Sequence, residues 1–165
     1  MSQPSKKNGK KGEPGEQVVA QNRAASYNYH ILEKMEAGMV LTGTEVKSLR
    51  GGKANLREAY AEVRRDGVWL MNCHISEYLP GGPFNHHPLS RRRLLLHKQE
   101  IQKLIGKTQP KGITLIPLRI YFRDGIAKCE LALARGKKDW DRRQSEKDKE
   151  TRREAEEAMY KSRRR

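Results

Sequence analysis

The apolar residues are concentrated in the middle of the chain, and this limits what can fold. Nearly all Leu, Ile, Val and aromatic residues lie between residues 18 and 134. The flanking segments are polar, with net charges of +2 over 1–17 and +5 over 135–165. Neither flank can bury enough apolar surface to offset the entropy lost on ordering. The sequence therefore predicts one globular domain over 18–134, a disordered basic arm over 1–17 and a charged C-terminal tail over 135–165.

The overall charge indicates the class of partner. The 165 residues include 35 Lys and Arg against 20 Asp and Glu, a formal net charge of +15. Such an excess favours a polyanion, most commonly a nucleic acid. No run approaches the roughly 18 apolar residues of a transmembrane helix, and no apolar stretch follows the first lysines as in a signal peptide. Cys73 and Cys129 lie outside any Cys-x-x-Cys pattern, which suits a reducing compartment. We expect a soluble, cytoplasmic protein that does not associate with a membrane.

The central segment shows mainly strand patterns. Tyr27, Tyr29 and Ile31 alternate with polar residues, as in a half-buried strand, and Gly38 is expected to bend the chain after it. Asp-Gly favours a type I′ hairpin turn, because both central residues of that turn need positive φ. Such a pair separates two sets of β-rich runs, 59–64 from 68–75 and 114–123 from 126–134. Two hairpins predict a mainly antiparallel sheet.

Two helical patterns interrupt the strands. One covers residues 44–51, where Thr44 can cap the start and Gly51 the end. The other covers residues 98–105 and is expected to stop at Gly106. The predicted fold class is mainly β: a small oligonucleotide-binding-type antiparallel barrel of five or six strands, two or three flanking short helices, and a charged C-terminal tail. The pattern alone does not separate this barrel from other small barrels.

No set of residues assembles a catalytic or metal site. Gly43-Thr44-Glu45 lacks the second glycine of a phosphate-binding loop or a dinucleotide fingerprint. His86-His87 lies in a Pro- and Gly-rich stretch without the spacing of metal ligands, so a surface loop is the favoured interpretation. We therefore expect a protein that is not an enzyme and that uses no cofactor and no metal.

Basic residues of the central segment are candidates for phosphate contacts. Arg91-Arg92-Arg93 forms a cluster, and although a charge run is usually a solvated face, the net charge and the barrel pattern favour binding here. Further candidates for phosphate contacts, chosen because they are basic, are Arg23, Lys47, Arg50, Lys53 and Lys128. Tyr27 and Tyr29 could stack on bases, but their alternation favours the core, and both alternatives remain open.

The C-terminal tail is rich in helix formers, with no Gly or Pro from residue 139 onward. Three acid-to-base pairs at i, i+4 spacing support a helix: Asp139–Arg143, Asp148–Arg152 and Glu157–Lys161. Its few apolar residues form no continuous stripe. The tail is therefore either a loose single helix or disordered segment, or a segment that folds on an RNA surface. Fully helical, it would reach roughly 40 Å.

Several short runs are more specific when taken together. They are Asn22-Arg23-Ala24-Ala25, Glu36-Ala37-Gly38, residues 41–55, Arg93-Leu94-Leu95-Leu96-His97, Gly136-Lys137-Lys138 and Asp141-Arg142-Arg143. In this order they resemble the SsrA-binding protein family, also called small protein B. The resemblance covers the chain from about Val18 to its C-terminal end.

The resemblance implies a fold, a function and partners. It implies an oligonucleotide-binding-type barrel that binds the transfer-RNA-like domain of transfer-messenger RNA, supports its alanylation and delivers it to stalled ribosomes. The tail would enter the decoding centre and the empty messenger channel of the 70S ribosome and form a helix there. The implied partners also include the product of alanyl-tRNA synthetase and elongation factor Tu. One protein would bind one RNA as a monomer.

The resemblance also implies roles for individual residues. The RNA-binding set would be Asn22, Arg23, Glu36, Lys47, Arg50, Leu95 and Lys128. The ribosome-engaging tail set would be Gly136, Lys137, Lys138, Trp140, Asp141, Arg142 and Arg143. By residue type alone Leu95 would be assigned to the core, and Glu36 would repel phosphate, so any RNA contact of Glu36 should be to a base edge or a sugar hydroxyl. Two positions depart from the family pattern: Ala24 replaces a basic residue, so that contact is expected to be lost, and Ala158 replaces a large apolar residue, which weakens packing of the tail tip.

Alternatives to a ribosome-rescue adaptor remain at this stage. A structural ribosomal protein or a general RNA-binding module would share the basic tails and the barrel. A nuclease would share the affinity for RNA but would cleave it.

Overall fold

Two long strands form the centre of the fold. In the computed structural model, which describes residues 15–164, β8 (Ile113–Arg123) and β9 (Ile126–Gly136) pair along nearly their whole length. The turn between them has positive φ at both central residues, Asp124 and Gly125 (52° and 75°). This geometry is the one a type I′ turn needs, and the predicted hairpin is confirmed.

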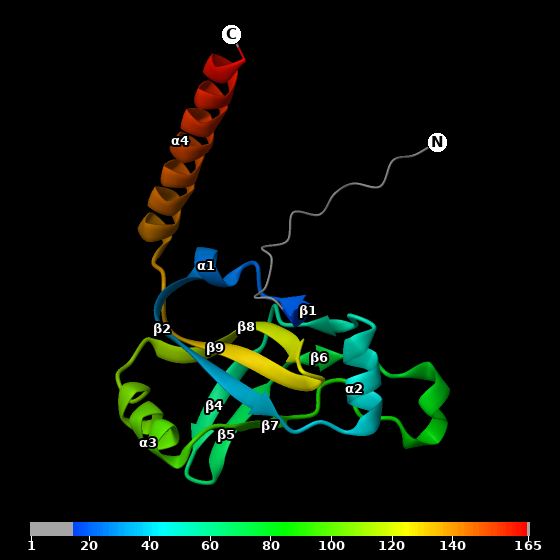
Figure 1. Ribbon diagram of the computed structural model, residues 1–165. Helices are drawn as coiled ribbons and strands as arrows, with labels where there is room; N and C mark the ends of the chain where they lie inside the picture. Colours follow the sequence, from blue (N-terminus) through cyan, green and yellow to red (C-terminus); the bar gives the residue numbers. More distant parts are fainter. Residues whose placement is uncertain (1–14, 165) are drawn as a thin grey trace, which may run out of the picture.

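The other strands continue the sheet from both edges of this hairpin (Figure 1). From β9 the order runs through β2, β7, β5 and β4, and β4 returns to β8 at the pair Ala61↔Leu115, so the pairings form a circuit. β1 pairs with the β8 edge beyond this point. As predicted, all these pairings are antiparallel. The strands other than β8 and β9 are β1 (Glu16–Gln21), β2 (Tyr29–Met39), β4 (Tyr60–Arg64), β5 (Gly67–Met71) and β7 (Arg92–Leu95).

Several local predictions about strands and turns are wrong. Tyr27 lies in the short helix α1 (Ala25–Asn28), before β2 begins. Gly38 does not bend the chain but lies within β2, paired with Leu95 and Lys128. The hairpin after β4 exists, but Gly67 pairs with Arg64, so Arg65 and Asp66 form the turn.

The run 68–75 is also divided, because β5 ends at Met71 and Asn72 adopts a positive φ of 53°. The rest of the run forms β6 (His74–Ile75), which pairs with β3 (Ala54–Asn55) in a separate two-stranded sheet. Polar Asn tolerates the left-handed region better than most residues, which explains why the break falls there. The described residues thus form nine strands, of which the six in the closed circuit agree with the predicted five or six of the barrel.

Two helices flank the barrel with ends that differ from the predicted ones. α2 (Gly43–Arg50) begins after Thr42, whose backbone N–H donates to Glu45 Oε2 at 2.9 Å, so Thr42 and not Thr44 is the N-cap. Gly51 follows the helix as predicted. α3 (Lys98–Lys107) passes through Gly106 and ends at Thr108, whose hydroxyl bonds the carbonyl of Leu104 at 2.8 Å.

The C-terminal tail is helical in the structure. α4 (Asp139–Arg163) has 25 residues, which corresponds to about 37 Å at 1.5 Å per residue. It projects away from the barrel (Figure 1), and none of the described α4 side chains is buried. β9 extends to Gly136, two residues beyond the predicted end of the domain. At the other end, Glu16 and Gln17 belong to β1, while residues 1–14 of the predicted arm lie outside the described residues.

The apolar core occupies the barrel interior and one smaller cluster outside it. The interior includes Leu49 from α2 and Leu70, Ile120 and Leu131 from three strands. The smaller cluster places α1 over the outer face of β8 and β9, and Tyr29 packs against it. Of the two tyrosines left open by the sequence, Tyr29 thus faces apolar neighbours, whereas Tyr27 is exposed.

A charged residue is buried beside this core. Arg92, the middle residue of the basic cluster, is only 2% exposed. Its Nε lies 2.7 Å from Glu45 Oε1, and the guanidinium also donates to the carbonyls of Cys73 and Pro88. Alternation along β7 turns Arg92 inward, while Arg91 and Arg93 point outward. The prediction that the whole cluster is available to phosphate is therefore wrong at Arg92.

The Arg92–Glu45 pair predicts a large effect on stability. Arg92→Met should lower the free energy of unfolding by about 3–5 kcal/mol, because it leaves the Glu45 carboxylate buried without its partner. Urea denaturation measures this. Arg93→Ala, at the exposed neighbour, is the matched control and should change stability by less than about 0.5 kcal/mol. Equal losses in the two variants would contradict a structural role specific to Arg92.

Candidate nucleic-acid interface

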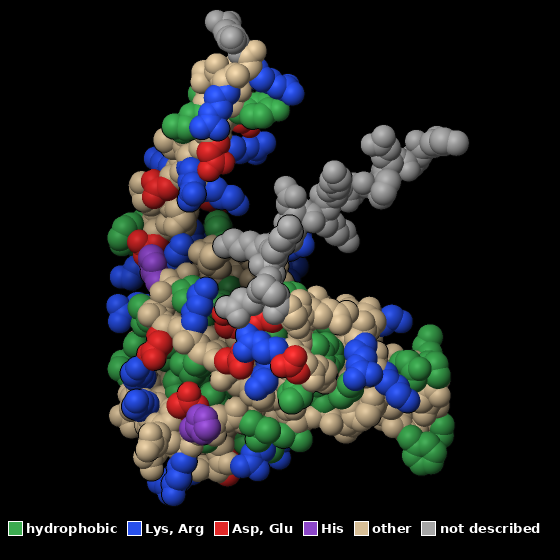
Figure 2. Space-filling view, viewed as in Figure 1, with side chains coloured by type: hydrophobic (Ala, Val, Ile, Leu, Met, Phe, Trp, Pro, Cys, Tyr) green, Lys and Arg blue, Asp and Glu red, His purple; other side chains and the backbone are tan. Residues whose placement is uncertain are grey.

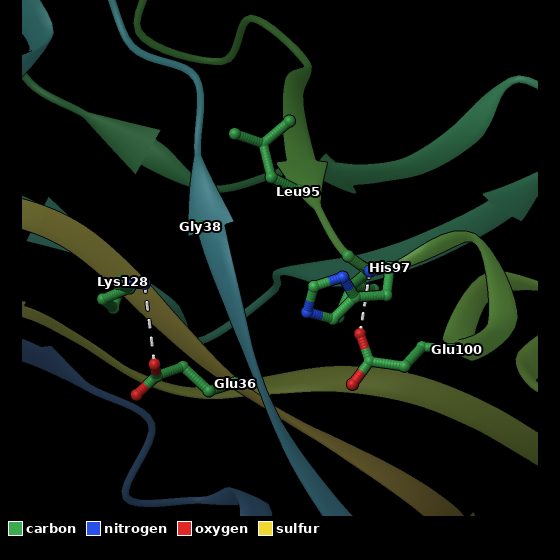
Figure 3. Close-up of a pocket in the computed structure, with 7 residues that line it drawn as sticks. Glu36, Gly38, Leu95, His97, Glu100 and Lys128 are labelled. Carbon is green, nitrogen blue, oxygen red and sulfur yellow. Dashed lines mark hydrogen bonds and ion pairs between the residues drawn. The ribbon is translucent and has the colours of Figure 1, made fainter.

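Three residues of the predicted RNA-binding set lie together on the outer surface of the barrel. Glu36 from β2, Leu95 from β7 and Lys128 from β9 line one pocket of about 360 Å³ (Figure 3). The register explains the grouping, because Gly38 pairs with Leu95 on one side and with Lys128 on the other. Glu36 is two residues from Gly38 and therefore lies on the same face of the strand. The remaining lining residues are Gly38, Leu96, His97 and Glu100.

Gly38 leaves room for the pocket. A Cβ at this position would lie 3.3 Å from Cβ of Leu95, tighter than most real contacts. Leu95 points outward and is 53% exposed, while its neighbour Leu94 is buried. The assignment of Leu95 to the core by residue type is thus wrong, and the alternation of β7 is the reason. One apolar side chain is therefore presented among polar ones.

Glu36 is held in place by donors from two other strands. Its carboxylate accepts a hydrogen bond from the Tyr121 hydroxyl, and it pairs with Arg123 at 3.1 Å and with Lys128 at 3.6 Å. Burial, followed by the hydrogen bond to Glu36, raises the pKa of Tyr121 above its usual value. Tyr121 therefore remains a hydrogen-bond donor to Glu36, beside the two cations Arg123 and Lys128. A carboxylate of this kind can accept N–H groups of a base or a ribose hydroxyl.

The sequence reasoning did not identify the charged network around Glu36. Arg119 pairs with Glu16 at 2.8 Å and with Glu130 at 3.2 Å, and Arg123 also pairs with Glu16. The guanidinium carbons of Arg119 and Arg123 lie 4.5 and 5.5 Å from the centre of the Tyr121 ring. Figure 2 shows Lys and Arg side chains alternating with Asp and Glu on this face. The only signal in the sequence is the alternation of residues 119, 121 and 123 along one strand.

The other predicted RNA-binding residues lie outside the pocket. Asn22 donates from Nδ2 to the carbonyl of Pro117 at 3.2 Å, which fixes the turn before α1, and Arg23 beside it is exposed. Lys47 and Arg50 lie on α2. Lys47 Nζ is 5.3 Å from the centre of the Tyr78 ring.

Part of the predicted ribosome-engaging set forms the junction between barrel and tail. Gly136 is the last residue of β9, and the backbone N–H of Lys137 donates to the carbonyl of Asn28 at 2.9 Å. Lys137 Nζ bonds the carbonyl of Ser26 and the hydroxyl of Ser145, both at 2.9 Å. Asp141 lies 3.4 Å from His30. These contacts connect α4 to α1 and β2.

Three of the remaining members of that set lie toward solvent, and the fourth, Arg142, is half-buried. Trp140 is 67% exposed, and Lys138 and Arg143 are exposed. Arg142 pairs with Asp139 at 3.5 Å within the first turn of α4. The set therefore contains two kinds of residue, those that connect the tail to the barrel and those that a partner can reach.

The described part of the chain contains neither a cluster of metal ligands nor a membrane-spanning helix. Among residues 15–164, no group of three His, Cys, Asp or Glu side chains is placed to hold a metal ion. None of the described helices combines the length and the apolarity needed to cross a membrane. Cys73 and Cys129 are both buried as free thiols, and burial raises the pKa of Cys73 to about 11. A thiol of this kind is a poor nucleophile.

Comparison with known proteins gave consistent matches. A family model described as SmpB protein matches residues 19–161. An SsrA-binding protein of Trichodesmium erythraeum is 52% identical over 151 residues, covering 91% of this chain and 97% of the relative. One from Desulforudis audaxviator is 55% identical over 139 residues, covering 84% and 91%.

A solved structure, "tmRNA-SmpB: a journey to the center of the bacterial ribosome", is also similar. Its TM-score is 0.62 at 48% identity, and the match covers 72% of this chain and 84% of that one. The fold and the surface described above define a basic antiparallel β-barrel protein with a polar pocket on its outer face and a projecting charged helix. With the family model matching most of its length, the chain belongs to the SmpB family.

The contact between Tyr121 and Glu36 predicts a distinct titration. The raised pKa of Tyr121 means that its contribution to stability is complete below about pH 10, the unfolded value, and is lost as the pH rises above it. Tyr121→Phe should lower the free energy of unfolding by about 1 kcal/mol near neutral pH and remove a late step from the tyrosinate absorbance titration. Tyr60→Phe, at an exposed ring, is the control that should keep this late step. Loss of the late step in the control alone would contradict the assignment.

Proposed function

We propose that this protein is an RNA-binding adaptor in ribosome rescue by trans-translation. It binds the transfer-RNA-like domain of transfer-messenger RNA and delivers this RNA to stalled 70S ribosomes. The main structural support is the pocket that brings Glu36, Leu95 and Lys128 together from three neighbouring strands. Family membership and the tmRNA–SmpB structure at 48% identity point to the same partners. The role is non-enzymatic and cytoplasmic.

The pocket can bind an exposed nucleotide by three different contacts. Lys128 can neutralise a phosphate, Leu95 can pack against the apolar face of a base, and Glu36 can accept from a base edge or a sugar hydroxyl. Each contact uses a group that is exposed or partly exposed. Arg23, Lys47 and Arg50 extend the binding surface along the barrel, and Asn22 orients the turn that carries Arg23.

The tail supplies the contact with the ribosome. α4 has alternating charges and exposed Trp140, Met159 and Tyr160, so it gains little by packing on its own barrel. It is suited to enter the decoding centre and the empty messenger channel, where its basic residues would contact ribosomal RNA. The Lys137 contacts at its base would keep the helix attached to the barrel during delivery.

Further parts of the proposal rest on the family resemblance alone. These are support for alanylation of the RNA, passage of the charged RNA with elongation factor Tu, and a monomer in a one-to-one RNA complex. The division into a basic arm over 1–17, a binding domain over 18–134 and a tail over 135–165 is also part of the proposal, and it rests on the distribution of apolar and charged residues.

The first test compares transfer-messenger RNA with ordinary transfer RNA. Purified protein should bind the former more tightly, with a preference that persists at physiological salt, because base and sugar contacts do not depend on counterion release as phosphate contacts do. Filter binding over a salt series measures this. Equal affinities that decline together would mean that net charge alone acts, and would favour a structural ribosomal protein or a general RNA-binding module.

A truncation separates the two halves of the mechanism. Removing residues 139–165 should leave transfer-messenger RNA binding nearly intact and abolish peptide tagging in a reconstituted translation assay with stalled ribosomes. The cut falls after Lys138 because Gly136 still pairs with Tyr29 and Lys137 still bonds the carbonyl of Asn28. Parallel loss of binding and tagging would show that the two-part mechanism is wrong.

A single lysine tests the pocket. Lys128→Ala should weaken transfer-messenger RNA binding and lower the salt slope by about one unit, as the loss of one phosphate contact requires. Lys149→Ala in α4 removes the same charge at a distant exposed site and is the matched control. An unchanged slope for Lys128→Ala would indicate that Lys128 serves only to pair with Glu36.

A further inference from the structure

A short apolar projection extends from the barrel beyond α2. The segment η1 (Leu79–Phe84) forms two short 3₁₀ pieces separated by a kink at Gly82, and in it Leu79 is 81% exposed and Phe84 is 88% exposed. Leu89, shortly after it, is half exposed. In Figure 1 this green turn lies at the end of the barrel opposite α4, and in Figure 2 it forms an apolar tip. Neither the pocket nor the tail uses these residues.

The projection is braced rather than loose. Asn85 bonds the backbone of Tyr78 twice, accepting from its N–H at 2.9 Å and donating to its carbonyl at 2.6 Å. His86 is buried and bonds the Thr44 hydroxyl at 2.9 Å and the carbonyl of Ile75 at 3.0 Å. Pro80 and Pro83 further restrict the backbone. The backbone that carries the exposed Phe84 ring is therefore fixed before any partner binds, which lowers the entropy lost on binding.

The charged surroundings of the projection favour an anionic partner. Lys47 of α2 lies over the Tyr78 ring at 5.3 Å, and the carbonyl of Lys53 accepts from the N–H of Ser76 at 3.0 Å, which places Lys53 beside the start of the segment. Figure 2 shows Lys and Arg side chains next to the apolar tip. Glu77 is the acidic residue of the stretch 76–90.

The size of the projection separates an RNA base from a protein partner. A stable protein interface buries about 800 Å² on each side, whereas one aromatic side chain can bury only about 150–250 Å². Three exposed side chains on a short turn are too few for such an interface. A single ring is sufficient to stack on a base, and nearby lysines can contact the adjoining phosphates.

We propose that Phe84 is a stacking platform for an unpaired base of transfer-messenger RNA, flanked by Lys47 and Lys53 on the phosphates. This inference rests on the proposed function and adds a second contact to it. The surface is continuous with α2, which carries Lys47 and Arg50 of the proposed RNA-binding set. It lies at the end of the barrel away from α4, the element proposed to contact the ribosome (Figure 1).

The test replaces the ring while keeping the fold. Phe84→Ala should weaken binding of the full-length protein to transfer-messenger RNA about tenfold, within the range for loss of one stacked base. The salt slope should not change, because no phosphate contact is lost. Phe84→Tyr should bind like the wild type. Tyr60→Ala, at an exposed aromatic ring in β4, is the matched control and should also bind like the wild type.

Additional measurements separate other occupants of the projection. Wild type and Phe84→Ala should bind equally well to 70S ribosomes in the absence of transfer-messenger RNA. The two free proteins should also sediment alike. The proposal is overturned by unchanged transfer-messenger RNA affinity in Phe84→Ala, or by an equal loss in Phe84→Tyr. It is also overturned by a loss seen only with ribosomes, or by a self-association that depends on Phe84. A wild-type protein without preference for transfer-messenger RNA over transfer RNA would instead overturn the proposed function.

Discussion

The buried ion pair between Arg92 and Glu45 connects the parts of the molecule on which both candidate surfaces depend. It joins β7 to α2, and the same guanidinium bonds the carbonyls of Cys73 and Pro88. A guanidinium can satisfy several acceptors at once from one planar group, which a lysine cannot do. Leu95 of the pocket lies three residues further along β7, and the braced segment that carries Phe84 ends near Pro88. Arg92, whose charge suggested a role in binding, therefore acts mainly by stabilising the fold.

The outer surface combines net positive charge with local neutralisation. Arg119 and Arg123 are paired with Glu16, Glu36 and Glu130, and so they do not form a simple basic patch. Pairing of this kind reduces nonspecific attraction to phosphate while leaving directional groups at the surface. The pocket accordingly combines the cation of Lys128, the carboxylate of Glu36 and the apolar side chain of Leu95. In such a site, shape and hydrogen bonding can add selectivity to the long-range attraction of the +15 charge.

Much of the fold could be predicted from local pattern. Asp124-Gly125 identified the central hairpin, because few residues other than Gly, Asn and Asp accept positive φ at both turn positions. The same dipeptide at 66–67 gave the hairpin but the wrong turn, since pairing of Gly67 with Arg64 is set by the barrel. Among the site residues, Lys128 followed from its charge, but Glu36 and Leu95 came only from family resemblance. Tyr121 and Arg123 were missed because their partners are far away in the sequence.

Composition and periodicity by themselves determined the antiparallel β class, the separation of an apolar domain from charged flanks, and the helical tendency of the tail. These depend on residue type and near neighbours, which the sequence contains directly. Only the tertiary structure decided that Arg92 points inward, that Leu95 points outward, and that Gly38 opens a pocket between Leu95 and Lys128. Each of these depends on strand register, and a shift of one residue would reverse which face a side chain occupies.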